Sequence, residues 1–218
     1  MSINISAADR GFIYGAALGD GYITKSGGAI RIKHSSKQYD YLVYKAHVLG
    51  RILSRNNPVK LFNNSGYPGA RWSAGNAAIL RPIRADIYRD GVKDWTRPGL
   101  FDVLTDESLA LIWMDDGNIT YKKRDGRIHA RVGYLSIYYD DRTKLQTVAD
   151  LFTRRFDILF TTAKDSHGYR LYLSAHALRK LVVKIRPYIH HSMLYKVDMR
   201  YTRTTYVEYN VSSPTAGR

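Results

Sequence analysis

Residues 13–21 read IYGAALGDG, residues 109–117 read LALIWMDDG, and these two stretches decide the fold. Each is a run of apolar and small residues that ends in an acidic residue followed by glycine. A helix that is apolar almost all round is expected to be buried. We therefore predict two buried helices, whose acidic ends are Asp20 and Asp116.

Gly11, Gly15 and Gly19 stand four residues apart, so they form a ridge without side chains along the first helix. Glycine inside a helix costs about 1 kcal/mol relative to alanine, and close packing of the backbone against another helix would offset that cost. The ridge therefore predicts close packing against another helix, and we take the two buried helices to pack side by side in parallel. Their acidic ends would then meet.

The chain repeats itself beyond these helices. Asp20-Gly21-Tyr22-Ile23-Thr24 returns as Asp116-Gly117-Asn118-Ile119-Thr120, 96 residues later. Around each copy the periodicity predicts helix, hairpin, helix, hairpin, helix. The fold class is therefore α+β, with two pseudo-symmetric αββαββα halves built on antiparallel sheets. The halves are expected at residues 1–97 and 98–218, and the Gly- and Pro-containing segment 90–105 is predicted to be a linker.

The remaining elements follow from local signals. Ser6 is expected to cap the first helix and Thr105 the helix that ends at Asp116. Further helices are predicted at residues 39–53, 76–88 (with Pro82 as a kink), 141–156 and 175–185, and strands at 59–62 and 70–74. Residues 212–218 are expected to be frayed.

The chain of 218 residues is strongly basic, with 34 Lys and Arg against 19 Asp and Glu, a net charge of +15. Such an excess points to a polyanionic partner, because neutralising phosphates releases counterions. The 18 tyrosines can pack and still hydrogen-bond a phosphate. No apolar run approaches the roughly 20 residues that cross a bilayer, so no membrane partner is expected. With no cysteine and no signal-like stretch at residues 1–4, an intracellular protein is expected.

Two carboxylates at two helix ends would form a concentrated negative site, because a helix C-terminus carries partial negative charge. In a basic protein such a site would repel a polyanion unless hard divalent cations filled it. Mg²⁺ prefers carboxylate, carbonyl and water oxygens. Metals held by Asp20 and Asp116 could activate water and stabilise the leaving oxygen of a phosphodiester.

The two stretches resemble the paired motifs of the LAGLIDADG homing endonucleases, in the single-chain branch with two motifs. The resemblance implies a monomeric double-strand DNA endonuclease that cuts a long specific site and spreads an intron or intein. It implies that Asp20 and Asp116 bind catalytic Mg²⁺, with backbone carbonyls of Gly19 and Asp115 at the metal site. Mn²⁺ is expected to substitute, and Ca²⁺ to bind without cutting.

The sequence departs from the family pattern at the two helices. Leu18 and Met114 stand where the family has an earlier acid, which mainly caps or packs. The second helix has Asp115 where the first has Gly19, so their packing cannot be strictly symmetric. The Asp115 side chain is either a support for the metal ligands or a solvated neighbour, and the second interpretation is favoured.

The family also places a basic residue near each active site, and Lys93 and Lys196 match it. They follow the two acids at similar spacings of 73 and 80 residues. An ammonium there could stabilise charge on the phosphate or polarise the attacking water. The alternative is a generic surface lysine. Lys33 and Ser136 are the nearest matches to the family's water-ordering residues on the second strand.

DNA contacts are expected from basic and aromatic side chains on the strands, mainly to phosphates rather than to base edges. The candidates are Lys25, Arg31, Lys33, Arg71, Lys122, Lys123, Arg127, His129, Arg131, Arg170 and Tyr172. Arg127, His129 and Arg131 are expected on one face of their strand and Ile128, Ala130 and Val132 on the other. Lys122 and Lys123 have the alternative of a solvated hairpin tip.

Two other functions stay open. The first is an intron maturase, an RNA-binding splicing helper on the same fold, although a maturase is free to lose the two acids that this chain keeps. The second is a DNA-binding regulator without catalysis. Phage, bacterial and organellar origins are all compatible with the sequence, and the target sequence is not encoded in it.

Overall fold

A computed structural model describes residues 5–125, 127–166 and 168–200 of the chain. The predictions for residues 1–4 and 212–218 lie outside this range. The first repeat consists of α1 (Ala7–Leu18), β1 (Tyr22–Ile23), β2 (Ala29–Ser35), α2 (Tyr39–Leu53), β3 (Lys60–Asn64), β4 (Tyr67–Gly75) and α3 (Ala77–Ile87). The second consists of α4 (Asp106–Asp116), β7 (Gly117–Arg124), β8 (Arg127–Tyr139), α5 (Arg142–Phe156), β9 (Thr161–Asp165), β10 (Gly168–Leu173) and α6 (Ala175–Ile185). The predicted α+β class and the doubled αββαββα order are confirmed.

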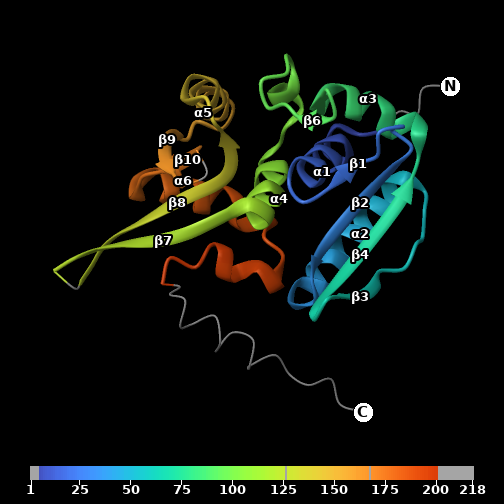
Figure 1. Cartoon of the computed structure of the whole chain (residues 1–218), viewed down its shortest axis with the longest axis horizontal. Coiled ribbons are helices and arrows are strands. Elements are labelled where there is room, and N and C mark those ends of the chain that lie inside the picture. The colour runs from blue at the N-terminus through green and yellow to red at the C-terminus, as the bar shows by residue number, and fades with distance from the viewer. Residues whose placement is uncertain (1–4, 126, 167, 201–218) are drawn as a thin grey trace, which may run out of the picture.

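The two sheets have the same topology. Their strand orders are β1-β2-β4-β3 and β7-β8-β10-β9, and all neighbouring strands are antiparallel. Helices α1 and α4 lie side by side at the centre of the molecule, with one sheet on either side of them (Figure 1). The sheets and the central helix pair together enclose one continuous apolar core.

Local signals set the helix boundaries as predicted. The Ser6 side chain accepts a hydrogen bond from the Asp9 amide, and Thr105 forms a reciprocal capping box with Ser108. These contacts satisfy amide groups that the first turn of a helix leaves without partners. Helices α2 and α6 begin and end at the predicted residues 39–53 and 175–185.

Side chains alternate along β2 between the core and the solvent. Ile30 and Ile32 are buried while Arg31 and Lys33 are exposed, which is the pattern of a strand with one face on the core. The prediction is only partly met in β8, because Ile128 is 40% exposed. The hairpin of β7 and β8 extends well beyond β9 and β10, so its outer end has no core to cover (Figure 1).

Residues 90–105 were predicted to be a linker, and this prediction is wrong. A small hairpin of β5 (Tyr88–Arg89) and β6 (Val92–Lys93) opens it, and a 3-10 turn (Leu100–Val103) follows. Trp95, Leu100 and Phe101 are buried in the core, so apolar burial fixes a segment whose Gly and Pro content indicated a free connection.

Three further 3-10 turns complete the described elements, at Ser36–Gln38, Arg186–Tyr188 and His191–Lys196. Trp72, Trp95 and Trp113 are all buried and pack in the core. Within the described ranges, every helix is too short or too polar to cross a membrane.

Candidate metal centre and nucleic-acid interface

The glycine ridge of α1 is the contact surface for α4. A Cβ atom added at Gly11 would lie 2.8 Å from Thr105 Cγ2, and one at Gly15 would lie 2.7 Å from Ser108 Cα. A Cβ atom at Gly19 would lie 2.2 Å from Asp115 Oδ2. The contacts advance in the same direction along both helices, which confirms the predicted parallel packing and brings the two acidic ends together.

The two helices end differently. Helix α1 stops at Leu18, so Asp20 lies beyond it, and the Asp20 amide donates to Asp115 Oδ2 at 2.9 Å. Helix α4 continues through Asp116, and the amide of Gly117 closes its last turn on the carbonyl of Trp113. Asp116 is therefore held by its own helix, whereas Asp20 is held by contacts from other elements.

Asp115 is a buried partner rather than a solvated neighbour, which corrects the favoured sequence interpretation. Lys45 Nζ on α2 donates to Asp115 Oδ1 at 2.9 Å and to Oδ2 at 3.0 Å. Both side chains are 0% exposed. The ammonium compensates a carboxylate that could not otherwise be buried without a large cost.

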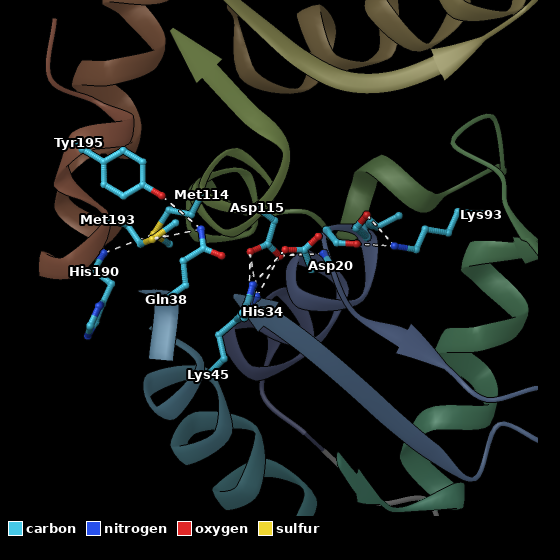
Figure 2. Close-up of polar contacts among 12 residues, drawn as sticks. Asp20, His34, Gln38, Lys45, Lys93, Met114, Asp115, His190, Met193 and Tyr195 are labelled. Carbon is cyan, nitrogen blue, oxygen red and sulfur yellow. Dashed lines mark hydrogen bonds and ion pairs between the residues drawn. The ribbon is translucent and has the colours of Figure 1, made fainter. Parts of the chain in front are cut away.

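His34 on β2 completes this cluster, and the sequence predictions did not include it. Its Nδ1 lies 3.1 Å from Asp20 Oδ2, and its Nε2 lies 4.0 Å from Asp115 Oδ1. Figure 2 shows His34 and Lys45 converging on the two carboxylates. The signal that could have revealed His34 is its phase: it follows Ile30 and Ile32 on the buried face of β2.

The pKa values of the two candidate metal ligands, Asp20 and Asp116, are shifted in opposite directions. Burial, together with the charges of Asp20 and Asp115, raises the pKa of Asp116 to about 7, against the opposing effect of nearby lysines. Burial alone would raise the pKa of Asp20 as well. The contact with the His34 ring, together with the charges of Lys45 and Lys93, outweighs burial and holds the pKa of Asp20 below its ordinary value.

Lys93 and Lys196 both lie at this centre. Lys93 Nζ donates to the carbonyls of Leu18 (3.1 Å) and Gly19, and Lys196 Nζ donates to the carbonyl of Gly117 at 2.7 Å. Burial lowers the pKa of both ammonium groups, and the charges of the aspartates oppose that shift. Each lysine therefore donates hydrogen bonds to backbone carbonyl groups at the end of one motif helix, close to the acidic residues.

The donor set suits a hard divalent cation. Atoms of Asp20, His34 and Asp115 that can bind a metal lie within 4.8 Å of one another. Lys45 already neutralises Asp115, and among the described residues Asp116 is not part of this group. The Asp20 side chain is 38% exposed, so it is accessible from solvent. A cation would also relieve the mutual repulsion that raises the pKa of Asp116.

Basic side chains lie on the exposed face of the first sheet. Lys33 on β2 pairs in register with Arg71 on β4, and Arg71 pairs with Lys60 on β3. Three cations thus stand side by side across three strands, and like charges in such positions repel. With Arg31 they line a cavity of about 610 Å³. A bound polyanion would compensate the charges of these cations.

The other predicted contact residues fall into two groups. Lys25, Lys122, Lys123, Arg127 and His129 are exposed, as is Ser136, whereas Arg131, Arg170 and Tyr172 are partly buried. On the second sheet Arg170 pairs with Asp165 at 2.9 Å and stacks on the Tyr134 ring at 3.8 Å. Lys122 Nζ lies 5.4 Å from the Tyr172 ring centroid. The second sheet therefore mixes cations with aromatic rings.

The fold is that of solved homing endonucleases. The structure of the homing endonuclease I-WcaI bound to its DNA recognition sequence matches with a TM-score of 0.74 and 18% identity, over 89% of this chain and 88% of that one. The meganuclease I-SmaMI bound to uncleavable DNA matches with a TM-score of 0.58 and 12% identity, over 94% of this chain and 93% of that one.

Sequence comparison identifies the family. The model of the LAGLIDADG DNA endonuclease family matches residues 10–181, and the chain belongs to that family. A curated relative, the RecA protein of Mycolicibacterium chitae, is 26% identical over 205 residues, or 87% of this chain. The chain spans about half the length of that relative (46%).

Proposed function

We propose that the protein is a site-specific, divalent-metal-dependent endonuclease that cuts both strands of DNA. The observation that supports this most directly is the parallel packing of α1 and α4, which joins Asp20 and Asp116 in one electrostatic cluster. Basic side chains on the sheets beside this cluster provide a surface for the phosphate backbone. An acidic centre next to a cationic surface suits hydrolysis of a phosphodiester.

Asp20 and Asp116 would each hold Mg²⁺ at one of two cutting centres, with backbone carbonyls of Gly19 and Asp115 as further ligands. Mn²⁺ would substitute, and Ca²⁺ would bind without supporting cleavage. When bound, the cation would supply an activated water and stabilise the leaving oxygen. The Gly19 carbonyl accepts a hydrogen bond from Lys93, so any contact that it makes with a metal is shared with this ammonium.

Lys93 and Lys196 would stabilise negative charge on the phosphate during attack, since both ammonium groups lie at the ends of the motif helices. Lys33 and Ser136 would order solvent around the scissile phosphates. They occupy equivalent positions, because the residue numbers of the two repeats differ by 103 at both ends of α2 and α5. Both are exposed on the sheet face that carries the basic side chains.

A monomer would suffice for cutting both strands, because one chain supplies both motif helices and both sheets. The halves would be residues 1–97 and 98–218, related by a pseudo-twofold axis that fits the local twofold axes of duplex DNA. The sheets would contact the DNA target through Lys25, Arg31, Lys33, Arg71, Lys122, Lys123, Arg127, His129, Arg131, Arg170 and Tyr172. Such a target would be long, and cutting it would serve the spread of an intron or intein.

The test is cleavage of a plasmid library of candidate sites, including the uninterrupted form of the host gene, with Mg²⁺, Mn²⁺ or Ca²⁺. Mg²⁺ and Mn²⁺ should yield linear plasmid, while Ca²⁺ should support binding alone. Asp20→Asn and Asp116→Asn should abolish double-strand cutting and keep binding, and the exposed control Asp102→Asn should cut normally. Unimpaired cutting by both variants would refute the mechanism. Stimulated splicing of intron RNA without DNA cleavage would favour the maturase.

A further inference from the structure

The environment of Asp20 has no counterpart in the second repeat. Strands β2 and β8 bury and expose residues in the same phase at a spacing of 103, so Ile137 takes the place of His34. Helices α2 and α5 are both 15 residues long, and the same spacing puts Val148 in the place of Lys45. Two apolar side chains of the second repeat thus replace the imidazole and the ammonium of the first.

The His34 side chain is buried and packs against a neighbouring ring. Its side chain is 1% exposed, and its ring packs against Tyr41 with a distance of 5.3 Å between ring centroids. Neither ring nitrogen makes a hydrogen bond of regular geometry within the described part of the chain. A buried polar group without such a partner is costly. The contact that the ring does have is from Nδ1 to the carboxylate of Asp20, at 3.1 Å.

Asp20 and Asp116 are held in different ways. Asp20 follows the end of α1, and its backbone is fixed from outside by the carboxylate of Asp115. Asp116 is the last residue of α4, so the helix fixes its backbone. A carboxylate that is free to rotate is a weak metal ligand. Hydrogen-bond partners of metal ligands typically set the orientation of those ligands.

We propose that His34 is a positioning residue that orients the Asp20 carboxylate, so that the two strands of DNA are cut by unequal centres. This inference rests on the proposed function for its consequence in cutting. The imidazole supports one carboxylate only, because Ile137 at the equivalent position cannot donate to Asp116. Loss of His34 should therefore impair one cutting centre and leave the other intact.

The first experiment measures strand cutting on supercoiled plasmid with each strand labelled at its end. His34→Leu should cut one strand about 10- to 100-fold more slowly, the range found for groups that orient metal ligands, so that nicked circles accumulate. His34→Asn should restore linear product, because its side-chain amide can take the place of Nδ1. Ile137→Val, at the matched position, should cut like the wild type. Equal slowing of both strands, or no rescue by Asn, would overturn the proposal.

The second experiment does not depend on cleavage. Binding of Mn²⁺ to the full chain is titrated by electron paramagnetic resonance, and unfolding is followed to verify that each variant is folded. His34→Leu should weaken binding about tenfold at one site, with Asn restoring it. Unchanged Mn²⁺ affinity in a folded His34→Leu protein would refute the positioning role. A wild type that binds Mn²⁺ but cuts no DNA would instead count against the proposed function.

Discussion

Lys45 on α2 and Asp115 at the end of α4 form a fully buried ion pair that joins the two repeats, with Nζ 2.9 and 3.0 Å from the carboxylate oxygens. The same carboxylate accepts the amide of Asp20 at 2.9 Å. One charged pair therefore ties a helix of the first repeat to the motif helix of the second, directly beneath the candidate metal ligand. The ammonium also lies 4.4 Å from the centroid of the Tyr41 ring.

Lys45→Met should lower the free energy of unfolding by about 3–5 kcal/mol, because it leaves the Asp115 carboxylate buried without its counter-charge. The double variant Lys45→Met/Asp115→Asn should recover part of that loss, since the neutral amide can still accept from Asp20. Urea denaturation measures all three proteins. Additive losses in the double variant would show that the two side chains do not act as a pair.

Gly15→Ala should destabilise the fold more than Gly11→Ala. The added methyl group at Gly15 would lie 2.7 Å from the Ser108 backbone, which cannot move aside, whereas the nearest atom at Gly11 belongs to the Thr105 side chain. Overpacking of this kind costs about 1–3 kcal/mol, more than the helix propensity that alanine gains. Thermal unfolding of both variants checks the order, and a more stable Gly15→Ala protein would contradict the packing described.

Asp94 should stabilise the fold at neutral pH and lose that effect in acid. Burial would raise its pKa, but the hydrogen bonds from the Thr96 side chain and amide, at 2.6 and 3.0 Å, and the charges of Arg89 and Lys144 lower it. The folded-state pKa therefore lies below that of the unfolded chain, near 3.9. The stabilisation is present above that value and disappears as the pH falls through the folded-state pKa.

Asp94→Asn should accordingly be less stable than the wild type by about 1 kcal/mol at pH 7, and the gap should narrow below about pH 4. Thermal unfolding of the variant and the wild type, measured between pH 3 and pH 7, gives the difference in stability and shows whether it narrows in acid. Asp102→Asn, an exposed substitution, serves as the control. A gap that stays constant across this range would mean that the charge of Asp94 does not contribute to folding.

The cationic row of Lys33, Lys60 and Arg71 should bind phosphates without reading sequence. Replacing any one of them by alanine should weaken binding to all DNA sequences alike and reduce the salt dependence by about one counterion. Binding is measured in Ca²⁺ at several salt concentrations. Lys180→Ala on α6 is the matched control, because α6 covers the opposite face of the second sheet. A loss confined to one DNA sequence would indicate a base contact instead.

The sequence predicts most of this fold because its signals are local. The boundaries of α2 and α6 follow from apolar spacing, and the starts of α1 and α4 from capping residues, each within a few neighbours. The glycine spacing of α1 predicts close packing against another helix, which the contact with α4 confirms. The segment before α4 was harder to predict, because burial of Trp95 and Phe101 depends on the assembled core rather than on nearby residues.

The candidate site was predictable only in part. Asp20 and Asp116 stand out because the motif repeats, and Lys93 and Lys196 because their spacing does. The contact of His34 with Asp20 and the pairing of Lys45 with Asp115 join separate elements, 14 and 70 residues apart in the chain. No periodicity relates such residues. A polar side chain in phase with a buried face is the one local sign, and it does not identify the partner.

The mismatch between Gly19 and Asp115 limits which copies of the repeat can pair through their motif helices. In a homodimer of two second repeats, an aspartate would face an aspartate across the helix pair, where a single Cβ atom on the glycine side would already lie 2.2 Å from Asp115 Oδ2. Val148 would offer neither acid an ammonium. A pair of second repeats would therefore need a small residue in place of one aspartate before its helices could pack as closely as α1 and α4 do.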